Sequence, residues 1–340
     1  MKYLQMKELT MLATQDVGRV HRLMGASVCR MPGSVVEQLL GLRAAISHFN
    51  MNRGLRSAFL YSNGWFLQWH EGPQEAVDEM WALAQAHPGN AHARIVHRSD
   101  GAATLPRPLH IASLHSRDKP SDVARRIYAV ERERELGWIA EPAEIWQALS
   151  APCLIEGADV MAAVARSHIV AVTSEFNESV DLVKAVAERS RAPVSYQRFA
   201  DGDPRMPDIG AAYVDTATGG QVTRLQAFSR RALEDGMVQL SLRRMHCLVL
   251  LLGNRPRPTT RLAATTAALL AGMPQRPPVR LVGPCLDTCD EVARALSCVP
   301  GLDIASIRAG VPGRQRADAV LDMLSDGSCT MPAELDLLLS

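Results

Sequence analysis

Aromatic residues are scarce in this sequence, and neither sign of charge predominates. Phe, Trp and Tyr make up 5% of 340 residues, and 37 Lys and Arg against 36 Asp and Glu leave a formal net charge of +1. A near-neutral chain gives no electrostatic reason to expect nucleic acid or an anionic membrane as partner. No apolar run reaches the roughly 18 residues of a membrane span, and the first residues lack the apolar stretch of a secretory signal. We therefore expect a cytoplasmic protein.

Cysteines are few and scattered. There are 7, an odd number, which favours reduced thiols over a disulfide framework. Cys285 and Cys289 could share a helix face, but no second pair of ligands lies near them in the sequence. We therefore expect small buried residues here and no metal.

The first half of the chain predicts a sheet with helices. A strand over 19–28 precedes a helix that Ser34 and Glu37 start with a capping-box pattern. Two short strands follow, joined at Asn63-Gly64, a strong hairpin signal, and Pro73 opens a second helix. Further strands fit 92–99 and 107–115. The order β-α-β-β-α-β with one more strand predicts an α+β, ferredoxin-like domain over 17–115. The first helix should bury one apolar face: Val35, Leu39, Leu42, Ile46 and Phe49.

Two of the 5 tryptophans lie in one segment, "GWFLQWHEGP", residues 64–73. In a strand, Trp65, Leu67, Trp69 and Glu71 would point one way, and Phe66, Gln68 and His70 the other. The Gln68 amide could bind a planar heterocycle between the helices, or it could be a satisfied polar group beside a packed core.

Residues 19–114 resemble a BLUF domain, the flavin-binding module of blue-light sensors. The similarity lies in "GLRSAFLYSNGWFLQWHEGP", which follows the family pattern of a Leu-Leu-Tyr strand, a turn and Phe-x-Gln-x-x-Glu-Gly. The resemblance implies that Gln68 is the glutamine that exchanges hydrogen bonds under light. It also implies that Asn50 and Arg56 lie at flavin-holding positions, with Phe49 in place of the first residue of the family's asparagine pair at the end of the first helix.

Other positions depart from the BLUF pattern. The first-strand tyrosine that supplies an electron and a proton is replaced by Gly25, and the Thr and second Gly of Gly-Ile-Thr-Gly are replaced by Arg56 and Ser57. The resemblance therefore implies no complete photocycle. We expect no cofactor, with FAD bound without photochemistry as the alternative.

A helical connector is expected over 116–160. Ser121 and Asp122 can cap a helix that carries Val123, Ile127 and Val130 on one face, and "EPAEIWQAL" favours a second, short helix. Strands then alternate with helices over 165–328, and one helix is expected over 230–244. This alternation predicts an α/β domain with a mainly parallel sheet covered on both sides.

In such a domain a ligand lies at the carboxyl ends of the strands, so the loop "TSEFNES", residues 173–179, is the place to look. It has no glycine and no lysine to hold a phosphate, and Glu175 and Glu178 would repel one.

Residues 168–326 resemble the small Ras-like GTPases of the bacterial gliding-motility type in the order of their elements. The resemblance places Ser174 and Ser179 at phosphate-loop glycines and Val180 at the lysine. It places Asp181 at the magnesium-binding hydroxyl, and of the guanine-reading residues it leaves only Asp287. It therefore implies a Ras-like, Rossmann-like domain without nucleotide chemistry.

The sequence as a whole predicts a non-catalytic signalling protein that acts through a protein partner, such as a GTPase or a roadblock-type regulator, or through a homodimer. The alternatives are a flavin sensor with altered photochemistry and, third, a nucleotide-binding GTPase-like protein. The segment 200–236 is expected to supply the interaction surface, since arginine is frequent at interfaces. A solvated basic face is the alternative there. The residues in question are Arg205, Arg224, Arg230 and Arg231.

Overall fold

The computed structural model describes residues 18–137, 140–151, 168–218, 221–309 and 313–325. The chain divides into two compact units, of which the first takes Met1–Ser113, Val123–Ser150 and Ala200–Pro207. The second takes Leu114–Asp122, Ala151–Phe199 and Asp208–Ser340. Most of α4 (Pro120–Glu135) and all of α5 (Pro142–Ser150), which the sequence assigns to a connector, therefore belong to the first unit. Residues 138–139 and 152–160 of that connector lie outside the described residues.

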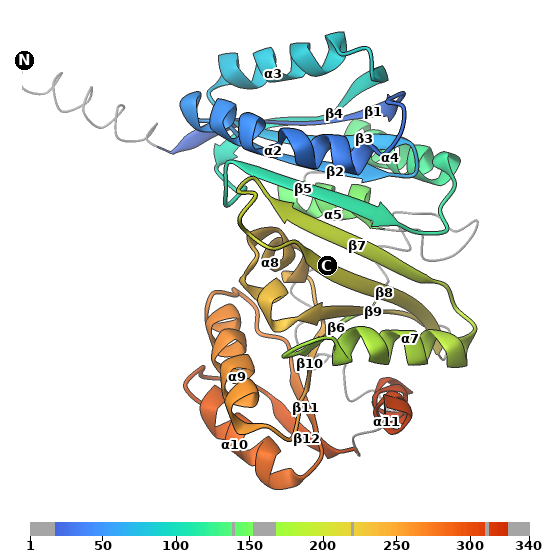
Figure 1. Cartoon of the computed structure of the whole chain (residues 1–340), viewed down its shortest axis with the longest axis vertical. Helices are drawn as coiled ribbons and strands as arrows, with labels where there is room; N and C mark the ends of the chain where they lie inside the picture. Colours follow the sequence, from blue (N-terminus) through green and yellow to red (C-terminus); the bar gives the residue numbers. More distant parts are fainter. Residues whose placement is uncertain (1–17, 138–139, 152–167, 219–220, 310–312, 326–340) are drawn as a thin grey trace, which may run out of the picture. The chain divides into compact units, whose positions relative to one another are not determined.

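Five strands form the sheet of the first unit, in the spatial order β5-β2-β3-β1-β4. The β2–β3, β3–β1 and β1–β4 pairs are antiparallel. Helices α2 (Val35–Asn52) and α3 (Gln74–Ala86) alternate with the strands along the chain in the predicted order (Figure 1). The strands are β1 (Arg19–Cys29), β2 (Arg56–Ser62), β3 (Trp65–Gly72), β4 (Asn90–Ala102) and β5 (Leu109–His115).

Local signals in the sequence set several of these boundaries. Asn63 and Gly64 adopt φ of 47° and 83°, the left-handed conformations that a tight two-residue hairpin requires. The Ser34 hydroxyl accepts a hydrogen bond from the Glu37 N–H at 3.4 Å, as the capping pattern predicts.

The predicted apolar face of α2 is wrong in part. Of its five residues only Val35 is fully buried, and the side chain of Leu42 is 54% exposed. The reason is that Leu39, Ile46 and Phe49 only partly enter the two apolar clusters under the helix, and Leu42 lies outside both clusters.

Both faces of β3 are buried, and the strand carries large side chains in both of its alternating sets. Leu23 of β1 is opposite His70 on the face covered by α2 and α3. On the other face, the rings of Trp69 and Trp146 of α5 lie 5.8 Å apart. Glu71 on that same face accepts hydrogen bonds from the N–H groups of Thr104 and Leu105. The alternation predicted for 65–72 is therefore confirmed.

Seven strands form the sheet of the second unit, in the order β12-β11-β10-β6-β9-β8-β7. β9, β6, β10, β11 and β12 are parallel, while β8 is antiparallel to β9 and β7 to β8. The strands are β6 (His168–Ser174), β7 (Val194–Asp201), β8 (Ile209–Thr218), β9 (Gln221–Ser229), β10 (Cys247–Leu251), β11 (Val279–Gly283) and β12 (Ile304–Arg308).

The helices of the second unit lie on both sides of this sheet (Figure 1). They are α7 (Glu178–Ser190), α8 (Gly236–Leu242), α9 (Pro256–Ala271), α10 (Leu286–Leu296) and α11 (Gly313–Ser325). Helices α7 and α11 pack on each other and on one side, and α9 and α10 pack together on the other. The chain is thus an α/β protein in the broad sense.

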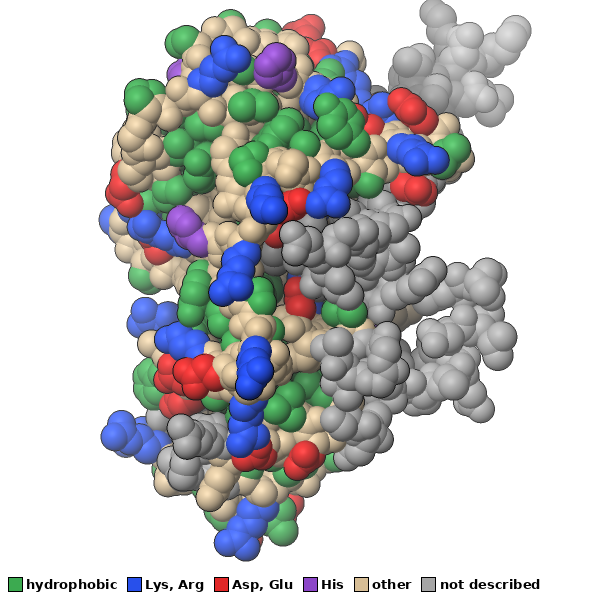
Figure 2. Space-filling view, turned by 90° about the vertical axis from the view of Figure 1, so that its right-hand side faces the viewer, with side chains coloured by type: hydrophobic (Ala, Val, Ile, Leu, Met, Phe, Trp, Pro, Cys, Tyr) green, Lys and Arg blue, Asp and Glu red, His purple; other side chains and the backbone are tan. Residues whose placement is uncertain are grey.

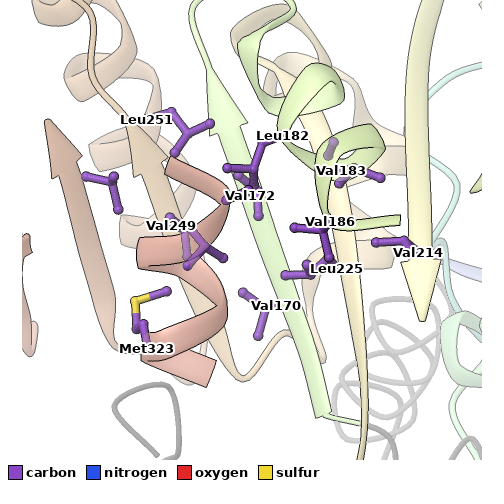
Figure 3. Close-up of a cluster of buried hydrophobic side chains, with 14 of the residues drawn as sticks. Val170, Val172, Leu182, Val183, Val186, Val214, Leu225, Val249, Leu251 and Met323 are labelled. Carbon is purple, nitrogen blue, oxygen red and sulfur yellow. The ribbon is translucent and has the colours of Figure 1, made fainter. Parts of the chain in front are cut away.

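The core under α7 and α11 is entirely aliphatic at its centre (Figure 3). Val172 of β6 and Val249 of β10 are fully buried, as are Val183 and Val186 of α7. Each such side chain contributes about 1.5–3 kcal/mol relative to an exposed one. The continuous apolar sequences of β6 and β10 are therefore explained by helices that cover both faces of these strands.

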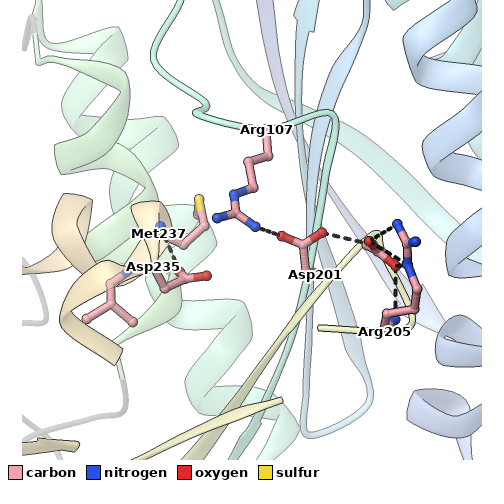
Figure 4. Close-up of polar contacts among 7 residues, drawn as sticks. Arg107, Asp201, Arg205, Asp235 and Met237 are labelled. Atoms are coloured by element: carbon pink, nitrogen blue, oxygen red, sulfur yellow. Dashed lines mark hydrogen bonds and ion pairs between the residues drawn. The ribbon is translucent and has the colours of Figure 1, made fainter. Parts of the chain in front are cut away.

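One predicted helix is split in two. The sequence favours a single helix over 230–244, but a 3-10 turn, η1 (Arg230–Glu234), ends before Asp235 and α8 begins after it. The Asp235 carboxylate accepts hydrogen bonds from the N–H groups of Met237 and Val238 at 2.9 and 3.2 Å (Figure 4). An aspartate that caps a helix in this way starts it anew, which explains the break.

Charged side chains of both signs are interspersed over the face that Figure 2 shows, in keeping with the near-zero net charge. Within the described part of the chain, no helix is long and apolar enough to cross a membrane. The described cysteines are free thiols, with Cys285 exposed and Cys289 buried.

Candidate functional site

The face of the first sheet that carries α2 and α3 is where the sequence places a ligand. Gly25 of β1 and Gln68 of β3 are directly opposite each other, and such partners direct their side chains to the same face. Trp81 of α3 lies over this point. A Cβ atom built on Gly25 would be no farther than 3.0 Å from Cζ3, Cη2 and Cε3 of the indole. The indole can occupy this position only because residue 25 has no side chain.

Trp81 is part of a closed apolar cluster. Its side chain is 4% exposed and packs with Leu23, Leu55 and Val77, against which Phe49 of α2 also lies. Phe49 occupies the first position of the asparagine pair in the BLUF pattern. The space between the helices over Gly25 is therefore filled by side chains of the chain itself.

Gln68 is hydrogen-bonded within the sheet. Its side-chain oxygen lies 3.2 Å from Nε2 of His70, and Nδ1 of His70 lies 2.9 Å from the Ser57 hydroxyl. Burial lowers the pKa of His70 to about 4, so the imidazole is neutral at neutral pH. Because Oε1 of Gln68 can only accept, we assign the imidazole proton to Nε2, and Nδ1 accepts from Ser57. The buried Ser57–His70–Gln68 row thus holds the amide of Gln68 in one orientation.

Asn50 is fully buried at the end of α2. Its side-chain N–H donates to the carbonyl of Pro108 at 2.7 Å, and its backbone carbonyl accepts from Leu55 N–H. The side-chain Oδ1 has no hydrogen-bond partner among the described residues. Asn50 therefore has a structural role at the edge of the sheet and one polar atom to spare.

Arg56, the third predicted flavin position, is not brought together with Gln68. Arg56 of β2 is paired with Glu71 of β3, and paired residues direct their side chains to the same face. Side chains alternate along a strand, so Glu71 is on the opposite face from Gln68, and so is Arg56. Its guanidinium donates to the carbonyl of Leu105 at 2.6 Å. Arg56 thus tethers the chain before β5.

The residues of this face do not fit a flavin as they are arranged. A flat ring stacked over Gly25 needs the volume that the Trp81 indole fills. The hydrogen-bonding groups that such a ring would use are the Gln68 amide, which His70 already engages, and Oδ1 of Asn50. Polar groups for a ring are present, but space for it is not.

The turn between β6 and α7 is the second place that the sequence singles out. The Ser174 hydroxyl accepts from Ser179 N–H at 3.0 Å, and the Ser179 hydroxyl donates to the Phe228 carbonyl at 2.8 Å. The N–H of Phe176 donates to the Glu178 carboxylate at 3.2 Å. Two of the backbone N–H groups of this turn are therefore engaged by side chains of the turn itself.

Glu175, which the sequence suggests would repel an anion, is compensated. Its carboxylate lies 3.1 Å from Nε of Arg230 and 2.8 Å from Nη2 of Arg261, and the side chain is only 9% exposed. Ionised pairs this buried are stable only when each charge is matched. Glu175 is thus a fixed part of the turn, held by α9 and the segment after β9.

The four arginines of the predicted interaction surface do not form one surface. Arg224 is buried and makes a two-pronged pair with Asp215, with contacts of 2.8 and 3.0 Å. Arg205 belongs to the first unit, where it pairs with Asp203 and lowers the pKa of that carboxyl to about 2 (Figure 4). Arg230 is held by Glu175. Arg231 is exposed and is the one of the four that has no ion-pair or hydrogen-bond partner in the described chain.

No family model matches the chain, and no curated protein matches it. Among solved structures, it is similar to BlrB, described as a BLUF protein in its dark state, with 22% identity over 34% of this chain and 83% of that one, and a TM-score of 0.27. BlsA in its ground state is 14% identical over 39% of this chain and 89% of that one, also with a TM-score of 0.27.

A longer alignment involves Klebsiella pneumoniae BlrP1 with FMN and cyclic diGMP. It covers 84% of this chain and 76% of that one at 16% identity, with a TM-score of 0.26. These descriptions are nearer to the flavin-sensor alternative than to the GTPase resemblance, which none of them names. At such TM-scores the likeness carries no functional argument, so the function is argued from the residues.

Sequence reasoning missed the role of Trp81, although the signal was present. A glycine within a strand of large residues commonly marks a close approach by another group. Gly25 lies within a predicted strand, and Trp81 is the largest residue of the second predicted helix. Reading the two together would have predicted the filled space.

Proposed function

We propose that this chain is a non-catalytic regulatory protein of BLUF type that has no blue-light photocycle and acts by binding another protein. The observation that carries the proposal is the contact between Gly25 and Trp81. The BLUF resemblance implies a tyrosine at position 25 as the donor of the light reaction. Here the position has no side chain, and the indole of Trp81, held in an apolar cluster, occupies the adjoining space.

A catalytic role is disfavoured by burial. The Ser57–His70 pair has the composition of a nucleophile and a base, but both side chains are fully buried. Its imidazole also has a hydrogen bond to Gln68, which fixes the pair as part of the sheet. A substrate has no access to it, so we assign the pair a structural role.

Flavin binding without photochemistry is the second candidate. It is favoured by the buried Oδ1 of Asn50, since buried acceptors normally have a partner. Binding would require the Trp81 side chain to leave its position over Gly25. The FAD of this alternative would then meet Asn50 and Gln68, but Arg56 is on the opposite face.

The second unit, by the same reasoning, is proposed to bind no triphosphate. Its turn after β6 has Val180 where a lysine would be needed, and Ser174 and Ser179 bond to each other. The proposal also includes a Ras-like fold for this unit and a cytoplasmic location. It takes the partner to be a GTPase-like or roadblock-type protein, or a second copy of the chain in a homodimer.

The test is whether the full chain carries flavin. The protein is purified from cells supplied with riboflavin, its visible absorption is recorded, and the supernatant after heat denaturation is assayed for FAD and FMN. We expect a colourless protein and no flavin, and we expect that Trp81→Ala binds more flavin than the wild type. Stoichiometric flavin in the wild type would replace the first proposal by the second candidate.

A further inference from the structure

A hollow of about 810 Å³ lies in the second unit, at the carboxyl ends of β6 and β9. The turn before α7 forms one side with Phe176, and β7 and β8 form another with Tyr196 and Gly210. Arg231, from the segment after β9, and Arg261, from α9, also line the hollow. The volume is within the usual range of ligand sites, about 300–1,000 Å³.

Three carboxylates at and beside this hollow pair with arginines. Asp208 accepts from Arg198 Nε at 2.7 Å, and Glu175 pairs with Arg230 and Arg261. Glu234 also contacts Arg230, and the nearby Glu178 carboxylate accepts a hydrogen bond from the Phe176 N–H.

One arginine of the lining is left without an ion pair. Arg198, Arg230 and Arg261 are engaged by these carboxylates, whereas Arg231 is exposed with no ion-pair or hydrogen-bond partner in the described chain. A guanidinium presents a planar fork of donors that matches a carboxylate. The hollow thus offers one anion-binding group on its lining.

Two aromatic side chains of the hollow remain open to solvent. Phe176 is 53% exposed and Tyr196 is 43% exposed, in a chain where aromatic residues are only 5%. Exposed aromatic and arginine side chains together are typical of protein-binding surfaces. Because the rings are only half covered, the hollow fits an extended segment lying across it better than an enclosed small molecule.

A phosphate is a poorer match than a carboxylate. The turn before α7 would have to supply several backbone N–H groups to phosphate oxygens, but Phe176 N–H and Ser179 N–H are engaged by Glu178 and Ser174. A carboxylate needs only the fork of one arginine. The turn before α7 therefore favours a carboxylate over a phosphate as the bound anion.

We propose that this hollow is the docking site for an acidic segment of the partner protein, with a carboxylate on Arg231 and adjoining apolar side chains on Phe176 and Tyr196. The inference rests on the proposed function, that the chain acts through protein contacts, and gives that contact a place and a chemistry. Arg205 and Arg224 have no part in it.

The test uses the full chain and a fluorescent peptide in which glutamates alternate with leucines and phenylalanines, with a lysine version of the same peptide as the probe of charge. We expect binding of the acidic peptide in the range of about 1–100 μM, weakening with added salt. Arg231→Glu should weaken it by at least about tenfold, as for loss of a charged hydrogen bond. Arg257→Glu, an exposed arginine of α9 outside the lining, is the matched control and should bind as wild type.

A second variant keeps the test independent of charge. A Cβ on Gly210 meets no atom within 4 Å, so Gly210→Tyr adds a side chain to the lining from a backbone position with room for a Cβ. It should also abolish binding. The proposal is overturned if the wild type fails to bind the acidic peptide, or if both Arg231→Glu and Gly210→Tyr bind it as well as the wild type.

The two levels of the proposal can fail separately. A host protein that is captured equally by wild type, Arg231→Glu and Gly210→Tyr would leave the protein-contact function standing and remove the hollow as its site. Acidic-peptide binding that depends on Arg231, in a chain that proves to carry stoichiometric flavin, would keep the hollow and revise the function of the first unit.

Discussion

The indole of Trp81 rests directly on the backbone of Gly25, where any other residue would place its Cβ atom. The two residues are 56 positions apart in the sequence, on α3 and β1, and each explains the other. Without the glycine the indole has no room, and without the indole the glycine would border an apolar gap. A single pair thus closes the space between α2 and α3 that the BLUF resemblance would assign to a ligand.

This relationship predicts a selective cost for adding one methyl group. Gly25→Ala should lower the free energy of unfolding by about 1–3 kcal/mol, the usual cost of overpacking a core. Gly210→Ala, where the added Cβ meets nothing within 4 Å, is the control and should change it by less than about 0.5 kcal/mol. Urea denaturation measures both, and equal effects of the two variants would show that Trp81 does not occupy this space.

The same pair predicts strong coupling in a double-mutant cycle. Trp81→Ala alone should cost about 3–5 kcal/mol because it leaves a large cavity. In the Trp81→Ala background, Gly25→Ala should cost little or even stabilise, since the overlapping ring atoms are gone. The coupling energy should therefore be about 1 kcal/mol or more. Additive effects would contradict direct contact.

Blue light should have no effect on the chain. Residue 25 has no side chain to supply the electron and proton that the BLUF resemblance requires there, and Gln68 is held by His70. We therefore expect that the full chain, mixed with FAD and illuminated with blue light, shows no reversible red shift of the flavin band. A free FAD sample treated in the same way is the control, and a red shift found only with the protein would contradict the prediction.

The order of elements could be predicted from the sequence because each boundary has a local signal. Asn63-Gly64 fixes the hairpin, Pro73 precedes α3, and Ser34 starts α2. The break at Asp235 could not be predicted in this way, because a capping aspartate and a helical aspartate look alike in an apolar pattern.

The candidate sites were harder to predict, since they depend on which residues meet across the fold. Alternation put Gln68 and His70 on the same face of the strand, but the hydrogen bond between the two side chains was not predicted. The four arginines of the segment 200–236 were grouped by proximity in the sequence. Their partners, Asp215 for Arg224 and Glu175 for Arg230, come from other strands and turns, and these decide which arginine stays exposed.

Guanine nucleotides should not bind the second unit. The Ser174 and Ser179 side chains hold the turn closed, and Val180 offers no positive charge to a phosphate. Calorimetry with GTP and magnesium should show no micromolar binding. The Ser179 hydroxyl also donates to Phe228, so Ser179→Ala should destabilise the protein by about 1–3 kcal/mol. Micromolar GTP binding by the wild type would show that the turn opens.

Stability should fall in acid in a way that depends on His70. Burial lowers the pKa of His70 from 6.5 to about 4, so between these values the unfolded chain binds a proton that the folded chain does not. The contribution is therefore fully present above about pH 6.5 and is lost as the pH falls toward 4. The difference amounts to about 3 kcal/mol at most.

Unfolding by urea at several pH values between 7 and 4 measures this loss. His70→Gln removes the titrating group, so its stability should fall less steeply over that range than the wild type, although it starts lower at pH 7. His97, whose pKa is also lowered, by burial and then by Arg134 and Arg22, is present in both proteins and cancels in the comparison. His48→Gln on the exposed side of α2 is the matched control and should keep the wild-type slope. Parallel curves for wild type and His70→Gln would mean that the imidazole takes up a proton as readily in the folded protein as in the unfolded chain, and the burial of a neutral His70 would then be wrong.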